Sequence, residues 1–324
     1  MNRASRLRHR GIALVTAMFV VALSTIAAVA MFESSNIAVH RASNLVQSEA
    51  AWWYAEGVES WVKGVLKQDA KNNQIDGLGD IWARPVDFLP IDNGSLRGRV
   101  EDLQGRFNLN NLATRDPARL KQYLAQFDYL LNNLPNIDPS KTRGIGAAVR
   151  DWVDEDSERI SLDGAEDNDY QGLDPPHRAA NAPMMSVSEL LEVRGMTSEL
   201  YTAMQPYVTV LPQIGTLINI NTAAEPVLLS LSANIDKSAL KSFLESRAAK
   251  PAMSAQEVFS GGANGFLLAD PMTNPQTLID VKSSFFRLSA EVFIGTGRVA
   301  LYSVYVRPSG GGDPVVIAHS TDVD

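Results

Sequence analysis

A basic leader followed directly by an uncharged, apolar segment opens the chain. Residues 1–11 contain four arginines and no acidic residue, and the next 21 residues, 12–32, carry no charge. At 1.5 Å per residue, a helix of this length spans about 30 Å, the thickness of the hydrocarbon core of a bilayer. Basic residues on its N-terminal side favour an orientation with the N-terminus in the cytoplasm. The sequence therefore predicts one membrane-spanning helix.

Two interpretations of this segment compete. Ala28-Val29-Ala30 offers the cleavage site of a removable signal peptide. However, the apolar core of such a peptide usually has about 7–15 residues. In addition, no proline occurs between Ile37 and Lys67, and apolar residues recur there at helical spacing. We therefore expect a single retained helix from Ile12 to about Lys67, roughly 80 Å long.

Strand and helix patterns follow a region rich in glycine, proline and aspartate at 77–94. Residues 96–103 alternate as a strand, and a turn at 104–105 with a return at 106–109 suggests a hairpin. Asp116-Pro117 is typical of a helix start, and the pattern continues to about Asn132. Further helices are predicted at 142–153, 186–193, 197–205, 222–231, 237–249 and 254–259, and strands at 285–295, 298–308 and 314–319.

This order of elements predicts an α+β fold. The long N-terminal helix should pack on a small antiparallel sheet, with a large, all-helical domain inserted into it. The expected divisions are a leader (1–11), the membrane-spanning part of the helix (12–32), the rest of the helix with the first strands (33–115), the inserted helical domain (116–270) and the C-terminal strands (271–324).

The segment from Asp151 to Asp174 is strongly acidic, with ten acidic residues in 24 positions and Arg159 as its one basic residue. A solvated acidic loop is the simplest interpretation of such a run. Two glycines and the apolar Ile160 and Leu162 are interleaved with the acids, however, which indicates packing. Packed carboxylates repel one another unless a cation neutralises them. Oxygen ligands without cysteine favour calcium over zinc or copper.

The spacing of these acids does not match an EF-hand. Counted from Asp154, the sixth position is Arg159 instead of glycine, and the twelfth is Ala165 instead of glutamate. Counted from Asp167, the sixth position is Gly172, but the twelfth is Arg178. Any calcium site is therefore irregular and takes ligands from both ends of the loop.

The N-terminus resembles the leader of type IV pilin-like proteins. In that family the peptidase cuts after the glycine, here between Gly11 and Ile12, on the cytoplasmic side of the membrane. The apolar helix is retained and the new N-terminal residue is methylated. The usual motif has glutamate at the fifth mature position, where this chain has Thr16. One branch of the family lacks this glutamate.

Several further motifs, in one order, resemble a single family, the type II secretion system minor pseudopilin K (general secretion pathway protein K). The matching stretches are RGIALVTAMFVVALSTIAA at 10–28, GRFNLNNL at 105–112, DWVDED at 151–156, GAEDNDY at 164–170, PPHRAAN at 175–181, SVSELLEVRGM at 186–196 and LININTA at 217–223. The last hundred residues match in strand pattern more than in motif. One departure is His177, where the family tends to carry tyrosine, which indicates packing in preference to metal binding.

The resemblance implies a non-enzymatic part of a filament. The family member sits at the tip of a short periplasmic pseudopilus with the minor pseudopilins I and J, is anchored in the inner membrane, and supports export of folded proteins. Further implied partners are the major pseudopilin, the prepilin peptidase, the outer-membrane secretin and secreted substrates. The family binds Ca²⁺ in the acidic loop. Carried over by motif, one side of the site comprises Asp151, Asp154 and Asp156, and the other comprises Glu166 and Asp167.

Two features of the chain suit a terminal position. A bulky inserted domain would block subunits above it but not those added below. The carboxylate missing at Thr16 is the group that, in pilin-like proteins, is thought to meet the N-terminal amine of the subunit above. A cap has no subunit above it.

Two other functions remain as alternatives. Residues 219–249 resemble the start of a helix-hairpin-helix DNA-binding element, but Ala233-Asn234-Ile235 stands where a glycine-containing turn should meet phosphates. The net charge of -8 becomes -12 when the four leader arginines are removed, which disfavours nucleic-acid binding. A membrane-anchored metallohydrolase could use Asp154, Asp156, Glu166 and His177. The chain has no cysteine and no G-x-S-x-G or H-E-x-x-H motif, so an enzyme is not expected.

Overall fold

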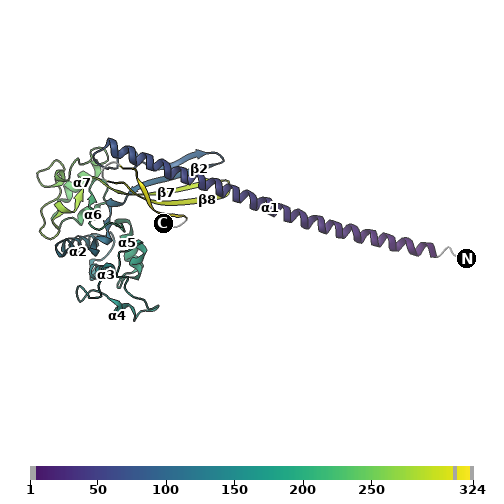
Figure 1. Cartoon of the computed structure of the whole chain (residues 1–324), viewed down its shortest axis with the longest axis horizontal. Coiled ribbons are helices and arrows are strands. Elements are labelled where there is room, and N and C mark those ends of the chain that lie inside the picture. Colours follow the sequence, from purple (N-terminus) through teal and green to yellow (C-terminus); the bar gives the residue numbers. More distant parts are fainter. Residues whose placement is uncertain (1–4, 309–311, 322–324) are drawn as a thin grey trace.

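A single helix of 68 residues dominates the computed structural model, which describes residues 5–308 and 312–321, with side chains from residue 12 onward. Helix α1 (Ser5–Asn72) projects from the globular part of the chain, and the N-terminus lies at the far end of this helix (Figure 1). The apolar side chains from Ile12 to Phe32 are exposed, and the helix is long and apolar enough to cross a membrane. The prediction of one continuous helix is confirmed.

A five-stranded antiparallel sheet packs against the C-terminal part of α1. Its strands, in the order β1-β2-β7-β8-β9, are β1 (Val86–Ile91), β2 (Gly94–Asp102), β7 (Phe285–Ile294), β8 (Gly297–Val306) and β9 (Val315–Thr321). Alternation along β7 directs one set of side chains, including Leu288 and Ala290, toward Val62 and Leu66 of α1. The predicted α+β core, a long helix on a small antiparallel sheet, is thus confirmed.

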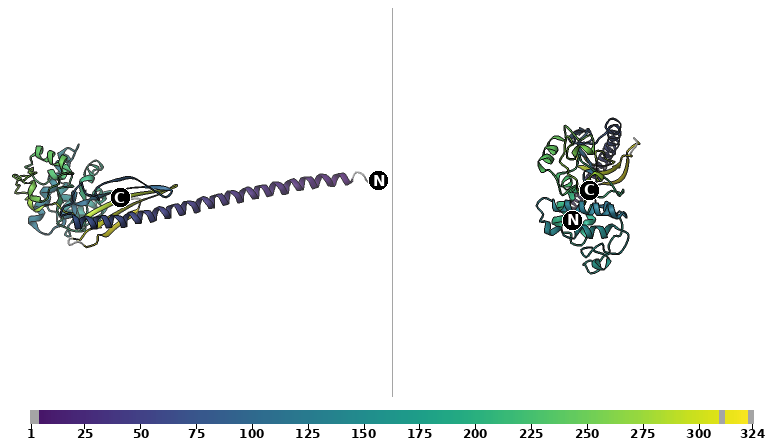
Figure 2. Two further views of the ribbon diagram at one scale, coloured as in Figure 1. Left: turned by 90° about the horizontal axis from the view of Figure 1, so that it is seen from above. Right: turned by 90° about the vertical axis from the view of Figure 1, so that its left-hand side faces the viewer.

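The chain leaves this sheet at the end of β2 and returns at the start of β7. Asp102 and Phe286 are paired across the two strands, so the intervening segment departs and returns at one place. The head formed by this segment lies at the end of α1 farthest from the N-terminus (Figures 1 and 2). Its helices are α2 (Pro117–Asn132), α3 (Ile145–Val153), α4 (Asp167–Tyr170), α5 (Ser198–Met204), α6 (Glu225–Leu229) and α7 (Lys237–Ser246). The expected bounds of the inserted domain, 116 and 270, fall within this segment.

The remaining elements of the inserted segment are short. Five-residue or shorter 3-10 helices occur at Leu103–Gly105, Leu109–Ala113, Pro139–Thr142, Gln205–Tyr207, Ala255–Val258 and Pro275–Thr277, and a six-residue one at Val187–Glu192. Two parallel pairs join β3 (Phe107–Asn108) to β4 (Val208–Thr209) and β5 (Ile218–Asn219) to β6 (Ile279–Asp280). The regular elements of the inserted domain are therefore helices apart from these two-residue strands, and irregular stretches such as residues 171–186 join them.

One sequence-based expectation of local structure is wrong, and strands β1, β4, β5 and β6 were not expected. Residues 104–109 do not return as a hairpin, because Leu103–Gly105 forms a 3-10 turn and β3 pairs with the distant β4. Strand β1 lies in the region at 77–94 that was expected to be a break. It is an exposed edge strand without clear alternation, so no strand pattern marks it in the sequence. The helix predicted at 186–193 is a 3-10 helix with the expected reciprocal cap between Ser186 and Glu189.

Buried asparagines form hydrogen bonds with backbone groups that are distant in the sequence of the inserted segment. Asn108 Oδ1 accepts a hydrogen bond from Leu211 N at 3.0 Å, and Asn111 Nδ2 donates to Thr216 O at 3.0 Å. Asn110 Nδ2 donates to Met184 O at 2.9 Å. Phe107 stacks on Phe127 at 5.1 Å between ring centroids. The asparagines of the GRFNLNNL motif thus hold distant backbone segments in place, because their side chains satisfy the hydrogen bonds of buried carbonyl and amide groups.

Candidate metal centre

Three carboxylates of the acidic loop converge in the structure. One oxygen each from Asp154, Asp156 and Glu166 lies within 4.8 Å of the others. Asp154 directly follows α3, whereas Glu166 directly precedes α4, so the two ends of the loop meet. Trp152 and Tyr170 contact each other edge to face at 5.3 Å and hold these two helices together. The loop therefore brings carboxylates from both of its ends together.

Two of these carboxylates are buried without enough hydrogen-bond donors. Glu166 is 5% exposed and Asp154 is 6% exposed. Neither Glu166 side-chain oxygen has a hydrogen-bond partner among the described residues, and the same holds for Asp154 Oδ1. Arg150 Nε lies 3.0 Å from the other Asp154 oxygen. Buried carboxylate oxygens without donors are costly, so their charged forms would be stabilised by a cation.

The pKa values of this cluster follow from the same arrangement. Burial, reinforced by Asp151, Asp154 and neighbouring acids, raises the pKa of Glu166 to about 7. Burial also raises the pKa of Asp154 to about 6, although Arg150 opposes the increase. A cation bound among these oxygens would stabilise their charged forms and lower both pKa values.

Asp151 lies beside this cluster and orders the loop. It is fully buried, and its Oδ1 accepts a hydrogen bond from Ile160 N at 3.0 Å. A Cβ added at Gly164 would lie 2.0 Å from Asp151 Oδ2, so the backbone approaches this carboxylate more closely than any other residue type would permit. Burial raises the pKa of Asp151, and backbone hydrogen bonds from Ile160 and Ala165 oppose this increase.

Asp167, the remaining predicted ligand, points to a different part of the loop. Its Oδ1 accepts a hydrogen bond from Ala179 N at 3.1 Å, and its Oδ2 lies 3.9 Å from Arg178 Nε. The structure thus brings together Asp154, Asp156 and Glu166, places Asp151 alongside them, and directs Asp167 toward residues 178–179. The motif located both sides of the site but could not give the direction of each side chain.

His177 packs against aromatic rings instead of joining the carboxylates. Its ring lies 5.0 Å from that of Tyr170 and 6.0 Å from that of Trp152, between centroids. Its Nε2 lies 3.3 Å from Glu192 O. A metallohydrolase centre that uses this histidine therefore finds no support in the geometry. The clustered donors are carboxylate oxygens, the ligand type that suits Ca²⁺.

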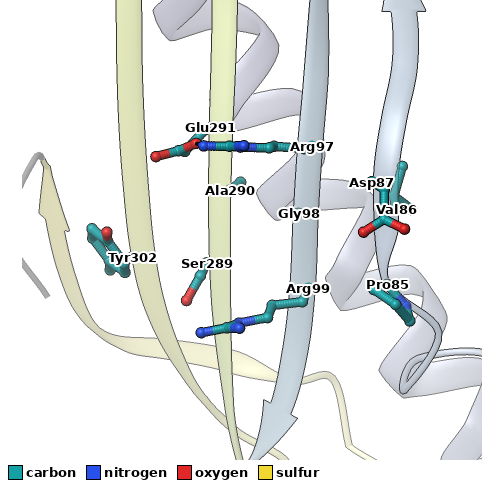
Figure 3. A pocket seen from close by; sticks show the side chains of 10 residues that line it. All are labelled: Pro85, Val86, Asp87, Arg97, Gly98, Arg99, Ser289, Ala290, Glu291 and Tyr302. Carbon is teal, nitrogen blue, oxygen red and sulfur yellow. Dashed lines mark hydrogen bonds and ion pairs between the residues drawn. The ribbon is translucent and has the colours of Figure 1, made fainter.

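A shallow pocket on the sheet has a different character. It lies on the face opposite α1 and is lined by Arg97, Arg99, Glu291 and Tyr302 among others (Figure 3). Arg97 and Arg298 both pair with Glu291. Arg99 pairs with Glu101 in the same way, so the arginines that line the pocket are held in ion pairs on a strand surface and supply no second candidate site.

The sequence-based predictions did not include a second group of carboxylates, formed by Asp69, Asp76 and Asp80. The run Asp76-Gly77-Leu78-Gly79-Asp80, close after α1, was the available sequence signal. It was overlooked because the region reads as a glycine-rich connection.

A long helix with an exposed apolar N-terminal part, packed at its other end on an antiparallel sheet, defines a pilin-like protein. Comparison with known proteins gives the family. The family described as "Type II secretion system (T2SS), protein K" matches this chain in two parts, residues 105–213 and 218–281. The chain belongs to the type II secretion system protein K family and is a minor pseudopilin of that system.

Curated relatives resemble the chain over most of its length. Type II secretion system protein K of Aeromonas hydrophila is 36% identical over 322 residues, covering 93% of each chain. The protein K of Pseudomonas aeruginosa is 31% identical and covers 94% of this chain and 90% of its own. That of Pectobacterium carotovorum subsp. carotovorum is 33% identical and covers 90% of both.

A solved structure has the same fold. It is a chain from the crystal structure of the GspK-GspI-GspJ complex of the enterotoxigenic Escherichia coli Type 2 Secretion System. The TM-score is 0.76 at 26% identity, and the match covers 88% of this chain and all of the other. The similarity supports the pseudopilin fold with its inserted domain.

Proposed function

We propose that this chain is the non-enzymatic terminal subunit of the type II secretion pseudopilus, which initiates filament assembly and thereby supports protein export across the outer membrane. The observation that carries the proposal is the position of the inserted segment. It forms a broad head at the end of α1 farthest from the membrane-spanning part (Figure 2). Such a head obstructs a subunit above it and leaves the helix free to join subunits below.

The chemistry of the helix start agrees with a terminal position. Thr16 Oγ1 donates to the carbonyl oxygens of Ile12 and Ala13, both at 3.0 Å, so this side chain is satisfied within its own helix. A hydroxyl cannot form the charged contact that a carboxylate at this position would make with the amine of a neighbouring subunit.

The proposed partners are other pilin-like subunits. The similar solved chain comes from a complex with GspI and GspJ, and we propose that this chain binds the corresponding minor pseudopilins I and J. The exposed apolar side chains of α1 would pack against their helices and that of the major pseudopilin. The secretin and secreted substrates would meet the exposed head in the periplasm.

Imaging of labelled filaments tests the terminal position. A label on the inserted segment should appear once, at one end of filaments formed when the major pseudopilin is overproduced. Label at regular intervals along the shaft would contradict the proposal, because a repeating subunit cannot be a cap.

Maturation is proposed to follow the pilin-like route. The prepilin peptidase would cut between Gly11 and Ile12, after which the new N-terminus is methylated and the head faces the periplasm. Mass spectrometry of the membrane-extracted protein should show Ile12 as the first residue, and Gly11→Leu should leave the precursor uncut. A mature start at Met31 would instead identify a removable signal peptide.

The acidic loop is proposed to hold structural Ca²⁺ through Asp154, Asp156 and Glu166, with Asp151 ordering the loop. Bound calcium would neutralise buried carboxylates that have no donors. A ligand that binds only the folded state stabilises it by about 2.7 kcal/mol at a hundredfold excess over Kd. Calcium should raise the melting temperature, Glu166→Gln should remove most of this effect, and Asp167→Asn is the matched control that should retain it. Equal melting temperatures with calcium and with chelator would refute the site.

A further inference from the structure

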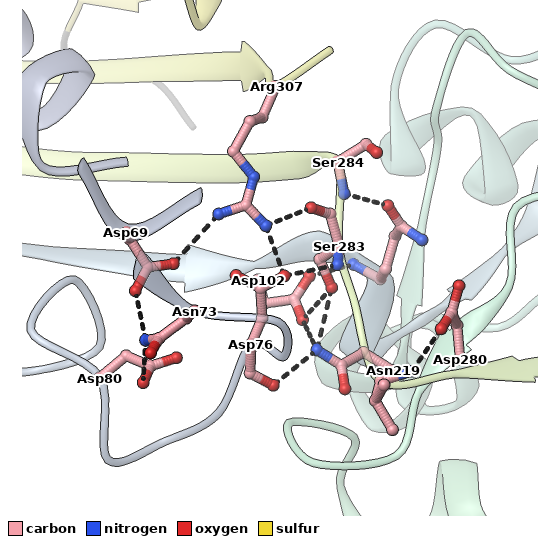
Figure 4. Close-up of polar contacts among 12 residues, drawn as sticks. Asp69, Asn73, Asp76, Asp80, Asp102, Asn219, Asp280, Ser283, Ser284 and Arg307 are labelled. Carbon is pink, nitrogen blue, oxygen red and sulfur yellow. Dashed lines mark hydrogen bonds and ion pairs between the residues drawn. The ribbon is translucent and has the colours of Figure 1, made fainter. Parts of the chain in front are cut away.

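Three carboxylates meet where α1, the sheet and the inserted segment join (Figure 4). Asp69 belongs to the last turns of α1, while Asp76 and Asp80 lie in the loop that follows. One oxygen from each lies within 4.8 Å of the others. The side chains of Asp69 and Asp76 are 8% and 1% exposed, respectively. This cluster lies outside the segment that carries the acidic loop.

Hydrogen bonds hold the three carboxylates in a fixed arrangement. Asn73 Nδ2 donates to Asp69 Oδ1 at 2.9 Å and to Asp80 Oδ1 at 3.1 Å. Gly77 N donates to Asp80 Oδ2 at 2.7 Å. Asp76 Oδ2 accepts from Ser283 N at 2.8 Å and from Arg307. The side chains are therefore positioned before any ligand arrives.

Asp76 Oδ1 is the exception in this network. It has no hydrogen-bond partner among the described residues, although the side chain is almost fully buried. The neighbouring Asp69 and Asp80 present further carboxylate oxygens to the same small region. A buried carboxylate oxygen without a donor, beside other acids, favours a positive partner, because it has little access to water and like charges repel.

Arg307 supplies part of the required charge. Its Nη1 lies 3.1 Å from Asp69 Oδ2, and its Nη2 contacts Asp76. One guanidinium cannot balance three carboxylates. Burial, with Asp80 and Asp76 as the next contributors, raises the pKa of Asp69 to about 6, and burial raises the pKa of Asp80. The negative end of the α1 dipole adds to this excess of negative charge.

We propose that Asp69, Asp76 and Asp80 bind a divalent cation, Ca²⁺ by its preference for irregular sets of carboxylate oxygens, at a second site independent of the acidic loop. The ion occupies the side of Asp76 that Arg307 leaves open. Carbonyl oxygens at the end of α1 and water would complete its coordination.

The position of this site gives the ion a mechanical role. Asp69 is fixed to α1, and Arg307 directly follows β8. Asn219 of the inserted segment donates to Asp76 O at 3.1 Å and to Asp102 Oδ2 at 2.9 Å (Figure 4). Occupancy would thus stiffen the joint between the head and the helix–sheet unit, whereas the acidic loop acts within the head alone.

Calorimetric titration of the full-length protein in detergent tests the proposal. An Asp154→Asn, Glu166→Gln double variant removes the acidic-loop site and should still bind about one Ca²⁺ per chain. Adding Asp80→Asn should weaken this binding at least tenfold, while Asp87→Asn, an exposed aspartate on β1, is the matched control that should not. The proposal is overturned if the double variant binds no calcium at millimolar concentration, or if Asp80→Asn leaves the affinity unchanged.

Terbium luminescence locates the ion without altering the acidic loop. Trp82, which is buried two residues beyond Asp80, should sensitise Tb³⁺ bound at this cluster. Trp82→Phe should remove one component of the emission from the otherwise unaltered chain, while calorimetry still shows calcium binding at that site. Circular dichroism checks that the variant is folded, and unchanged Tb³⁺ emission from a folded Trp82→Phe protein would place the ion elsewhere.

Discussion

Glu166 and Asp169 are three residues apart in the acidic loop, yet their environments are opposite. Both Glu166 carboxylate oxygens lack donors, whereas Asp169 accepts hydrogen bonds from Glu166 N, Arg159 and Arg194. Burial alone would raise the pKa of Asp169, but these donors outweigh it and the pKa lies below its usual value. The environment of each carboxylate, and not the acidic composition, therefore determines which groups can bind an ion.

Without calcium, the stability of the protein should fall as the pH rises. The pKa of Glu166 is about 7 in the folded chain and 4.5 as the reference value for an unfolded one. The stabilisation from its protonation is complete below about pH 4.5 and is lost as the pH rises through 7. Calorimetric melting in chelator should show this decline between pH 5 and 8. Glu166→Gln should reduce the slope, with Asp154 and Asp69 contributing the remainder, and equal slopes for the two proteins would contradict the assignment.

The close approach of Gly164 to Asp151 gives a second prediction at this scale. Gly164→Ala places a methyl group against a buried carboxylate and should destabilise the protein by about 1–3 kcal/mol, as overpacking does elsewhere. Its calcium affinity should fall as well, because the loop must shift. Gly172→Ala is the control, since its Cβ would meet no atom closer than 3.9 Å. Thermal denaturation with and without calcium distinguishes the variants.

Residue types and their order predicted both sides of the acidic-loop site but not its geometry. DWVDED and GAEDNDY contain the carboxylates that lie close together, while the direction of the Asp167 side chain depends on Ala179 and Arg178. Asp69, Asp76 and Asp80 could not be recognised as a cluster from composition, because a helix end and a loop must first be positioned against β8. Three-dimensional packing, and not local sequence, determines these contacts.

Helix α2 and strand β3 show when an element can be predicted from local sequence. Asp116 accepts hydrogen bonds from Ala118 N at 2.9 Å and Arg119 N at 3.4 Å, and Pro117 occupies the first helical position, so the predicted bounds of α2 are confirmed. Strand β3 instead depends on β4, about one hundred residues later, and no local pattern identifies that partner. The same applies to edge strand β1, which is defined by its pairing with β2.

The two parts of α1 should respond differently to truncation of an apolar side chain. Leu66 is fully buried against the sheet, and Leu66→Ala should cost about 2–5 kcal/mol through lost burial and the cavity left behind. Leu45 is 69% exposed on the same helix, so Leu45→Ala should change the free energy of unfolding of the head little. Denaturant unfolding, monitored by tryptophan fluorescence, provides the comparison. Equal losses would mean that the sheet does not pack on α1 as described.

At the scale of the whole molecule, the proposed terminal position rests on two features, the bulk of the head and the absence of a carboxylate at Thr16. Thr16→Glu separates them, because it restores a carboxylate at the fifth mature position and leaves the head unchanged. We expect the labelled variant to remain at one end of the filament, since the head still obstructs the subunit above. Immunogold imaging, with the unsubstituted chain as control, measures the label along the shaft. Entry of the variant into the shaft would show that the missing carboxylate is the dominant restriction.

The pairing of Asp102 with Phe286 has a consequence for how such a subunit can arise. The sheet order β1-β2-β7-β8-β9 follows the order of its strands along the chain, so the sheet alone is a simple meander. The whole head occupies the place of one hairpin turn, because directly opposed residues of antiparallel strands lie only about 5 Å apart. A short loop could join β2 to β7 without changing the register of any strand. With the terminal position proposed above, enlarging a single turn would be sufficient to convert a repeating filament subunit into one that ends the filament.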